Sequence, residues 1–369
     1  MYDAAVIGGG ILGCATALHL ARGGMKVVIA ERDSLCRQAS GVNAGTHSMQ
    51  MKRAALIPYA LKGWEMWRDA PQWLGMEVGF RTTGGLTLAF TEDEAEALKT
   101  RMGRRIDAGA PIEMVTAERA RAIEPGLSDT AVLASYCPID GFANAALTGL
   151  AMRRALLEDG VDVRERSAVD GIERDGGGFV VRAGETRLAA RRVVLAAGVW
   201  AGPMLAWLGV PIDIVCGARH VAVTERTRPI MRTILGEATG KLSIIQPGNG
   251  TVLIGGGWPA VGSPKHGSMT VIPKNLVGNF QLACATVPAL TRTRVVRAWP
   301  GLDANVADHL PLVGALPGLD DAFIIGCVRG GYTTGPYMGR LLGELILGRE
   351  PEMALFDPGR FGQASHAVH

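Results

Sequence analysis

The chain has 369 residues, of which 48% are hydrophobic, and a net charge of +3 at pH 7. This length favours one large domain or two interleaved domains, and the nearly balanced charge, with arginines dispersed among acidic residues, argues against a nucleic-acid partner. Six cysteines without a CxxC pair indicate neither a disulfide framework nor a metal site. The sequence has no run of ~20 consecutive apolar residues and no secretory leader, which predicts a cytoplasmic protein without a transmembrane segment.

The first predicted elements are a strand, a tight turn, a helix and a second strand. Residues 3–8 (DAAVIG) form a short apolar run that ends at glycine, and residues 11–24 (ILGCATALHLARGG) are apolar at helical spacing. Residues 26–32 (KVVIAER) are rich in valine and isoleucine, which is typical of a strand buried in a parallel sheet. The pattern predicts a βαβ unit.

The glycines of this unit predict a dinucleotide site. Gly8 suits a tight turn, Gly10 lets a pyrophosphate approach the backbone at the helix N-terminus, and Gly13 lets the helix pack closely on the strand. Glu31 closes the second strand, where a carboxylate can accept hydrogen bonds from both ribose hydroxyls and would repel a 2′-phosphate. We therefore expect a cofactor that contains ADP. The other contacts expected here are Ile11, Leu12 and Arg32.

The middle of the chain predicts a helix followed by a meander of strands. Residues 142–160 have helical periodicity and a glycine stop, and residues 161–202 supply short strands joined by glycine-rich turns. The strand RRVVLAAG ends at Ala197 and Gly198, and such small residues let the backbone lie close to a flat ring. A hairpin before this strand favours a two-dinucleotide-domain flavoprotein over a nicotinamide dehydrogenase.

The segment 330–348 predicts a helix that begins near Thr334 or Gly335. Pro336 has a fixed φ and no N–H, which suits the first helical turn, and apolar residues recur after it at helical spacing. Free N–H groups at such a helix start stabilise negative charge on a nearby ligand.

Five motifs in this order resemble the D-amino-acid oxidase family, which includes glycine oxidase, sarcosine oxidase and the flavin subunits of opine and hydroxyproline dehydrogenases. The motifs are GGGILG with Glu31 and the stretches 84–98, 138–152, 193–202 and 308–348, so the resemblance covers nearly the whole chain. It implies an α/β (α+β) fold, with a Rossmann-like FAD-binding domain and an interleaved, mostly antiparallel-sheet substrate domain.

The resemblance also implies domain boundaries. The FAD-binding domain is expected to comprise residues 1–80, 141–212 and 296–369. The substrate domain is expected to comprise residues 81–140 and 213–295, which are richer in strand-like and turn-like runs. The alternative is that these insertions serve only as structural cover.

The resemblance places two further loops at the flavin. The flavin is expected to be noncovalent FAD, because the residues before Asp308 (PGLDANVA) lack the cysteine that holds the flavin of single-chain sarcosine oxidase. One loop lies within residues 39–53, and the other is GGYTT. The cofactor contacts implied in these loops, and in the meander, are Ser40, Asn43, Ala44, Gly45, Val169, Gly330, Gly331, Tyr332, Thr333 and Thr334.

The expected substrate site combines Arg329 and Tyr332 with His47 and Lys52 on the opposite loop. Arg329 matches a glycine-oxidase arginine, and its planar fork suits a carboxylate, although a surface ion pair is the alternative. Glycine-oxidase-like members carry another arginine after a Gly-Leu pair, where this chain has Asp303. The arginines and lysine of single-chain sarcosine oxidase are also absent.

These residues favour an FAD-dependent enzyme that oxidises the C–N bond of a secondary amine or amino acid by hydride transfer to flavin N5. The expected small-molecule substrate is of the opine, imino-acid or N-methyl-amino-acid type, and the chain acts alone or as the catalytic subunit of a heteromeric dehydrogenase. The alternatives are a stand-alone glycine, sarcosine or D-amino-acid oxidase that uses oxygen, an FAD-dependent 2-hydroxy-acid dehydrogenase, and a flavin-bearing electron-relay subunit without turnover alone.

Overall fold

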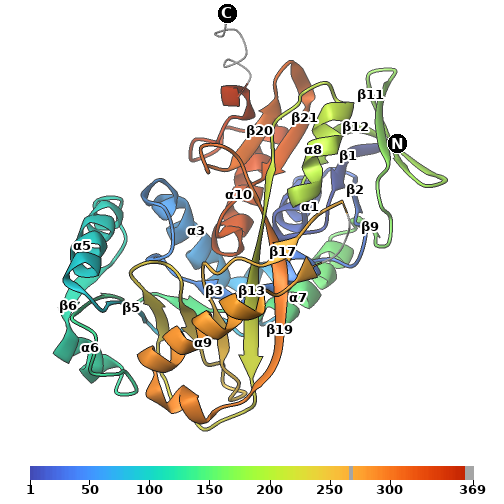
Figure 1. Ribbon diagram of the computed structural model, residues 1–369. Helices are drawn as coiled ribbons and strands as arrows, with labels where there is room; N and C mark the ends of the chain where they lie inside the picture. The colour runs from blue at the N-terminus through green and yellow to red at the C-terminus, as the bar shows by residue number, and fades with distance from the viewer. Residues whose placement is uncertain (266–268, 362–369) are drawn as a thin grey trace, which may run out of the picture.

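Two eight-stranded sheets organise the computed structural model, which describes residues 1–265 and 269–361 (Figure 1). The parts of the predicted domains at 266–268 and 362–369 lie outside the described residues. Within the described ranges, no helix has the length and apolarity needed to span a bilayer.

The first sheet has a parallel core. β1 (Tyr2–Ile7) pairs with β2 (Val27–Ala30) on one side and with β12 (Thr186–Leu195) on the other. β9 (Asp162–Arg164) continues the sheet beyond β2, and β21 (Leu319–Gly326) continues it beyond β12. All four pairs are parallel, so the predicted βαβ unit and its return strand are confirmed.

Antiparallel strands extend this core. β10 (Gly171–Asp175) and β11 (Gly178–Ala183) form a hairpin whose second strand pairs with the first half of β12. β20 (Leu312–Leu316) pairs with β21. The hairpin predicted ahead of VVLAAG is therefore present.

The second sheet is antiparallel except for one pair, β14 with β5. Its strands, in spatial order, are β19 (Val295–Asn305), β13 (Val215–Thr224), β16 (Leu253–Gly255), β15 (Ser243–Ile245), β14 (Ile234–Glu237), β5 (Gly85–Ala89), β7 (Leu133–Cys137) and β6 (Glu113–Thr116). Pairing with β13 continues along β19 as far as Asn305, so the third FAD-binding piece, expected from residue 296, starts inside a strand of this sheet. The rest of the domain division remains a prediction.

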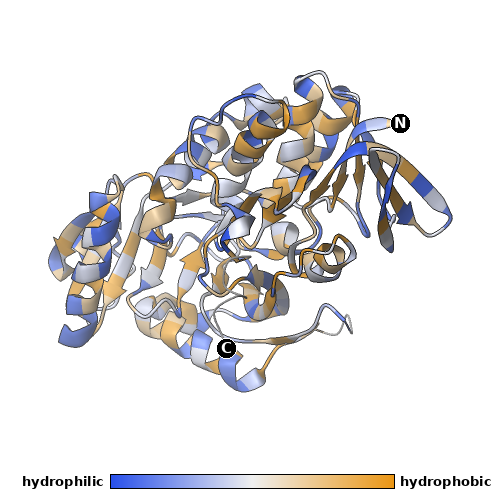
Figure 2. Ribbon diagram, turned by 90° about the horizontal axis from the view of Figure 1, so that it is seen from above, coloured by the Kyte–Doolittle hydropathy of each residue, from blue (hydrophilic) through white to orange (hydrophobic). Residues whose placement is uncertain are grey.

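The parallel strands are buried on both faces, which explains their uninterrupted apolar sequences. Ala4 and Val6 pack toward the long helices, whereas Ala5 and Ile7 pack toward α8 and the hairpin. Figure 2 shows hydrophobic residues concentrated on these central strands. The helices of the first face are α1 (Ile11–Arg22), α3 (Ile57–Arg68), α7 (Ala145–Glu158) and α10 (Gly331–Ile346), and α8 (Ala201–Trp207) lies on the second face.

The remaining elements are short, apart from two longer helices that pack against strands of the second sheet. The helices are α2 (Ala39–Val42), α4 (Ala70–Leu74), α5 (Glu92–Asp107), α6 (Ala117–Ile123) and α9 (Pro273–Thr286), with 3₁₀ turns η1 (Ala54–Leu56), η2 (Gly198–Trp200), η3 (Pro288–Arg292) and η4 (Pro358–Phe361). The short strands are β3 (Thr46–His47), β8 (Gly141–Phe142) and β4 (Arg81–Thr82), which form one small sheet, and β17 (Val261–Gly262) with β18 (Met269–Thr270), which form another.

Helix α10 begins at Gly331, so the predicted start near Thr334 or Gly335 is wrong, and Pro336 lies inside the helix. The proline has no N–H to donate to the carbonyl oxygen of Tyr332, one helical turn earlier. The indole N–H of the buried Trp67 donates to that oxygen instead, at 2.9 Å. A side chain from α3 thus donates the hydrogen bond that Pro336 cannot donate. The carbonyl oxygen of Tyr332 is therefore satisfied, and proline is tolerated at this position.

Glycine lets α10 pack closely on its neighbours. A Cβ on Gly339 would lie 2.7 Å from the Cβ of Ala15 on α1, and a Cβ on Gly63 of α3 would overlap the carbonyl oxygen of Thr333. We therefore infer that backbone contact between these three helices depends on the missing side chains.

Gly339→Ala should lower the free energy of unfolding by about 1–3 kcal/mol, because the added methyl group overpacks the α1–α10 contact. Gly103→Ala is the matched control: a Cβ on Gly103, which lies in α5, would have no neighbouring atom within 4 Å, so this change should raise stability by roughly 0.5–1 kcal/mol. Urea unfolding measures both. Equal responses of the two variants would contradict the packing described for α10.

Candidate functional site

The turn between β1 and α1 permits close backbone approach. Gly8 has a φ of +107°, and a Cβ there would lie 2.5 Å from the carbonyl oxygen of Ala196. A Cβ on Gly13 would overlap the carbonyl oxygen of Gly8, whereas a Cβ on Gly10 would meet only Ser40 Oγ, at 3.3 Å. The protein's own packing therefore requires Gly8 and Gly13, whereas a Cβ on Gly10 would meet one side-chain atom and no backbone atom.

The start of α1 presents unpaired donors. The N–H of Ile11 donates to Ser40 Oγ at 3.0 Å, and that of Cys14 is the first to donate back into the helix, to Gly10. The N–H groups of Leu12 and Gly13 have no hydrogen-bond partner within the described residues. Such N–H groups, together with the helix dipole, fit a phosphate.

Glu31 lies at the other end of this site, immediately after β2. Its buried carboxylate accepts hydrogen bonds from the N–H groups of Gly9 at 2.6 Å and Asp33 at 2.8 Å. The N–H of Ser167 donates to the Glu31 carbonyl at 2.7 Å, and this brings the loop that carries Val169 beside it. The carboxylate is an acceptor for hydroxyl groups, and its position fits the ribose of an adenosine.

The loop after β12 completes this end of the site. Ala197 and Gly198 lead into η2, whose Trp200 ring lies 4.2 Å from the guanidinium carbon of Arg32. Four predicted segments thus meet here, although they are separated by up to about half of the chain.

Asn43 shapes the loop between α2 and β3. Its side-chain amide donates to the carbonyl oxygens of Ala39 at 3.0 Å and Ser40 at 2.8 Å, and its side-chain oxygen accepts from Gly45 at 2.7 Å. Gly45 has a φ of +77°, and any Cβ there would overlap the carbonyl oxygen of Ala143. The contacts of the Asn43 side chain lie within the loop, which leaves the backbone around Ala44 to face a ligand.

Buried polar atoms without partners gather where β3 meets α10. Thr46 Oγ1, Thr334 Oγ1 and both ring nitrogens of His47 have no hydrogen-bond partner among the described residues. Thr333 Oγ1 donates to the carbonyl oxygen of Thr46 at 3.4 Å, so β3 and α10 are in direct contact. An unpaired buried polar atom is costly, and the polar edge of a flavin would satisfy such groups.

His47 and Tyr332 lie together in an aromatic cluster. Their ring centroids are 5.1 Å apart, and the Trp67 ring lies 5.0 Å from each. The hydroxyl of Tyr332 hydrogen bonds to Thr148 Oγ1 on α7 at 2.7 Å. Burial, with a smaller contribution from the charge of Lys52, lowers the pKa of His47 well below its usual range. The imidazole is therefore neutral, and the tyrosine hydroxyl is directed toward α7.

Lys52 is buried and reaches the loop that precedes α10. A Cβ on Gly330 would lie 3.0 Å from Lys52 Nζ. Burial is the main cause that lowers the pKa of Lys52 from 10.5 to about 8, with Asp140 opposing and Arg105 adding to the shift. Sequence reasoning missed Asp140, whose buried carboxylate accepts hydrogen bonds at the loop between β3 and η1.

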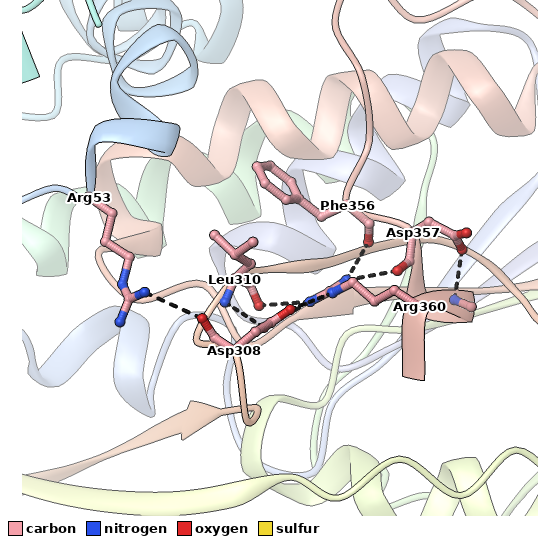
Figure 3. A network of polar contacts seen from close by, with 7 residues as sticks. Arg53, Asp308, Leu310, Phe356, Asp357 and Arg360 are labelled. Atoms are coloured by element: carbon pink, nitrogen blue, oxygen red, sulfur yellow. Dashed lines mark hydrogen bonds and ion pairs between the residues drawn. The ribbon is translucent and has the colours of Figure 1, made fainter. Parts of the chain in front are cut away.

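Arg329 is exposed and belongs to a cluster of charges from four separate segments. Partial burial lowers the pKa of its guanidinium, Arg219 and Arg53 add to this effect, and Asp303 opposes it. Arg219 Nη1 lies 2.6 Å from Asp303 Oδ2, so the acid forms an ion pair between the neighbouring strands β13 and β19. Arg53 donates to the carbonyl oxygen of Asp308 at 3.3 Å (Figure 3).

Arg53 and Arg219 were not predicted from the sequence. Arg53 directly follows the predicted Lys52, which is a usable signal, whereas Arg219 becomes visible only when the register of β13 against β19 is known. The structure thus brings Lys52, Gly330 and Arg329 together, and it places His47 with Tyr332 in the adjoining packed cluster.

Comparisons with known proteins identify a family of flavin enzymes. The family model described as FAD dependent oxidoreductase matches residues 3–345. Glycine oxidase of Geobacillus kaustophilus is 27% identical over 374 residues, which cover 99% of this chain and 97% of that protein. An opine oxidase subunit of Rhizobium meliloti is 27% identical over 376 residues, covering 97% of each. The crystal structure of the G. kaustophilus glycine oxidase matches with a TM-score of 0.88 and 26% identity over 96% of each chain.

Gly10→Val should remove the dinucleotide and leave the fold intact, because the added side chain enters the space at the start of α1 without striking the backbone. Gly13→Val should disrupt the fold, since its side chain would overlap the Gly8 carbonyl. Flavin content after purification and circular dichroism separate the two effects. A folded Gly10→Val protein with full flavin content would contradict this assignment.

Lys52→Met should change how stability depends on pH. Between the folded pKa of about 8 and the unfolded value of 10.5, the unfolded wild type binds more protons than the folded one, so its free energy of unfolding rises with pH. The difference between wild type and variant should therefore shift by roughly 3 kcal/mol in favour of the wild type across this window. Denaturant unfolding at a series of pH values measures it, and parallel pH profiles would refute the buried lysine.

Proposed function

This chain belongs to the family of FAD dependent oxidoreductases whose model matches residues 3–345, and from that premise we propose that it oxidises the C–N bond of a secondary amine that bears a carboxylate. It is an oxidoreductase of the glycine-oxidase and opine-oxidase type. The substrate class proposed is that of opines, imino acids and N-methyl amino acids, with hydride transfer to flavin N5.

The observation that carries this proposal is the group of arginines beside the loop that precedes α10. Arg329 is exposed there and is influenced by the charges of Arg53 and Arg219. A guanidinium binds a carboxylate through two parallel hydrogen bonds, whereas it repels the ammonium group of a simple amine. The charge of this site therefore favours an amino acid over an amine without a carboxylate.

FAD, when bound, supplies the hydride acceptor. We propose that the N–H groups of Leu12 and Gly13 hold its pyrophosphate, that Glu31 holds its ribose, and that Thr46 and Thr334 meet its ring system. The attachment proposed is noncovalent, because the segment 300–307 contains no cysteine.

The protein's own residues have separate proposed roles. Arg329 orients the substrate through its carboxylate. Lys52, with a pKa of about 8, is mostly neutral only above that pH, and in this form it can accept the proton of the substrate ammonium, which leaves a neutral amine for oxidation. His47 is neutral and packed, so it acts by shaping the site. The β13–β19 ladder lies next to α2 and shields the site from water on that side.

A second candidate is a stand-alone oxidase that passes electrons to oxygen, and the glycine oxidase relative favours it. The opine oxidase relative is called a subunit, which favours a heteromer with a partner chain. Hydrogen peroxide formation by the purified single chain would support the stand-alone oxidase, and turnover that requires a co-purified second chain would support the heteromer.

Anaerobic mixing of the purified flavoprotein with amino acids, secondary amines and 2-hydroxy acids tests the proposed chemistry. Secondary amines that carry a carboxylate should bleach the flavin absorbance, and their amides should not. Bleaching by 2-hydroxy acids alone would replace the proposal with the hydroxy-acid dehydrogenase.

Arg329→Lys should raise KM by about ten-fold or more and leave the flavin spectrum unchanged, since a planar pair of donors becomes one point charge. Arg340→Lys is the control, because Arg340 is a surface residue of α10 that pairs with Glu352. Unchanged kinetics in the Arg329 variant would remove this residue from the substrate site.

A further inference from the structure

We propose that the substrate carries a second carboxylate, which Arg219 binds, and that Asp303 is the positioning residue for that arginine. This inference rests on the proposed function and adds a specificity determinant to it. A single-carboxylate amino acid would then be a poor substrate.

The two residues lie on one face of the β13–β19 ladder. Gly217 is paired with Asp303, and Arg219 is paired with Gly301, so the alternating side chains of these positions share a face. On that face, the indole of Trp299 donates to the carbonyl oxygen of Val42 at 2.8 Å. The face is therefore turned toward α2 and the loop that carries the expected flavin contacts.

The Arg219–Asp303 pair leaves binding groups unused. Asp303 Oδ2 accepts from Arg219 Nη1 at 2.6 Å and from Asn305 Nδ2 at 3.0 Å. Arg219 Nε and Asp303 Oδ1 are buried and have no hydrogen-bond partner within the described residues. Nη1 of the guanidinium is thus held by the acid, whereas its Nε–H lacks a partner, and a carboxylate bound side-on would satisfy that donor.

The surrounding charges favour a dianion. Arg329, Arg219 and Arg53 contribute three positive charges near one another, and Asp303 contributes one negative charge. Asp308 does not alter this balance, because its carboxylate is paired with Arg360 at 2.8 Å (Figure 3). The carboxylate next to the reacting carbon neutralises one of the two remaining positive charges, and a second carboxylate neutralises the other.

The placement of the three arginines supports a single site. A Cβ on Gly330 would lie 3.0 Å from Lys52 Nζ. Lys52 is next to Arg53 in the chain and Gly330 is next to Arg329, so the two segments that carry these arginines lie side by side. Arg219, on the second sheet, is close enough for its charge to act on Arg329. A substrate between them would contact Arg329 with one carboxylate and Arg219 with the other.

Sarcosine and iminodiacetate form a matched pair of probes, because both are secondary amines of glycine and only iminodiacetate has a second carboxylate. Perturbation of the flavin absorbance gives Kd, and anaerobic bleaching gives the reduction rate. Wild type should bind iminodiacetate about ten-fold or more tightly than sarcosine. Arg219→Gln should raise Kd for iminodiacetate by about ten-fold and raise Kd for sarcosine by a much smaller factor. Arg226→Gln, at an exposed position beyond β13, is the control and should change neither.

Asp303→Asn distinguishes two effects of Asp303, namely positioning of Arg219 and repulsion of the substrate carboxylate. If Asp303 positions Arg219, the variant should bind iminodiacetate more weakly, although it has lost a negative charge. Tighter binding in this variant would overturn the positioning role. Flavin content and melting temperature, measured for every variant, identify any that fails to fold, and Arg219→Lys then provides a second test with an intermediate Kd expected.

The two levels of proposal fail differently. Bleaching by sarcosine with no preference for iminodiacetate, or equal losses for both probes in Arg219→Gln, would overturn the second-carboxylate site and retain amine oxidation. Bleaching by 2-hydroxy acids alone would overturn the proposed function itself and, with it, this inference.

Discussion

The contact of α10 with α1 and α3 is the constraint on which the site depends. Gly339 and Gly63 let the three helices touch through backbone atoms, and the indole of Trp67 supplies the hydrogen bond that Pro336 cannot make. Because the turn proposed to bind the pyrophosphate leads into α1 and the loop with Arg329 leads into α10, this packing sets the distance between the cofactor's expected pyrophosphate and the expected substrate anchor. A shift of either helix would move both ends of the site.

Local sequence was sufficient for elements whose geometry is determined by neighbours in the chain. The βαβ unit, the hairpin and the glycine roles at Gly8 and Gly13 follow from periodicity and from the sterics of a tight turn. The start of α10 could not be predicted in this way, because the side chain that accommodates Pro336 lies on α3, far earlier in the chain. Arg219 was likewise missed, since only the pairing of β13 with β19 places it beside Asp303. Long-range partners are absent from a local pattern.

The buried polar groups around β3 and α10 oppose stability in the protein alone. Lys52, Thr46 and Thr334 are placed where a core would favour apolar side chains, and desolvation is the main cause of the low pKa of Lys52. Local rules of folding are commonly broken where a protein binds or reacts. A bound ligand that satisfies these groups would stabilise the folded chain as well as complete the site.

The ladder of β13 and β19 also limits the order in which mutations can accumulate. A side chain at position 217 would strike Asp303 Oδ1, so an acid in this conformation at position 303 is compatible only with glycine opposite it. Asp303 in turn fixes the guanidinium of Arg219, which makes three positions on two strands interdependent. A lineage that gains a bulky residue at 217 must first lose the acid, and the charge pattern of this face is therefore difficult to reverse one substitution at a time.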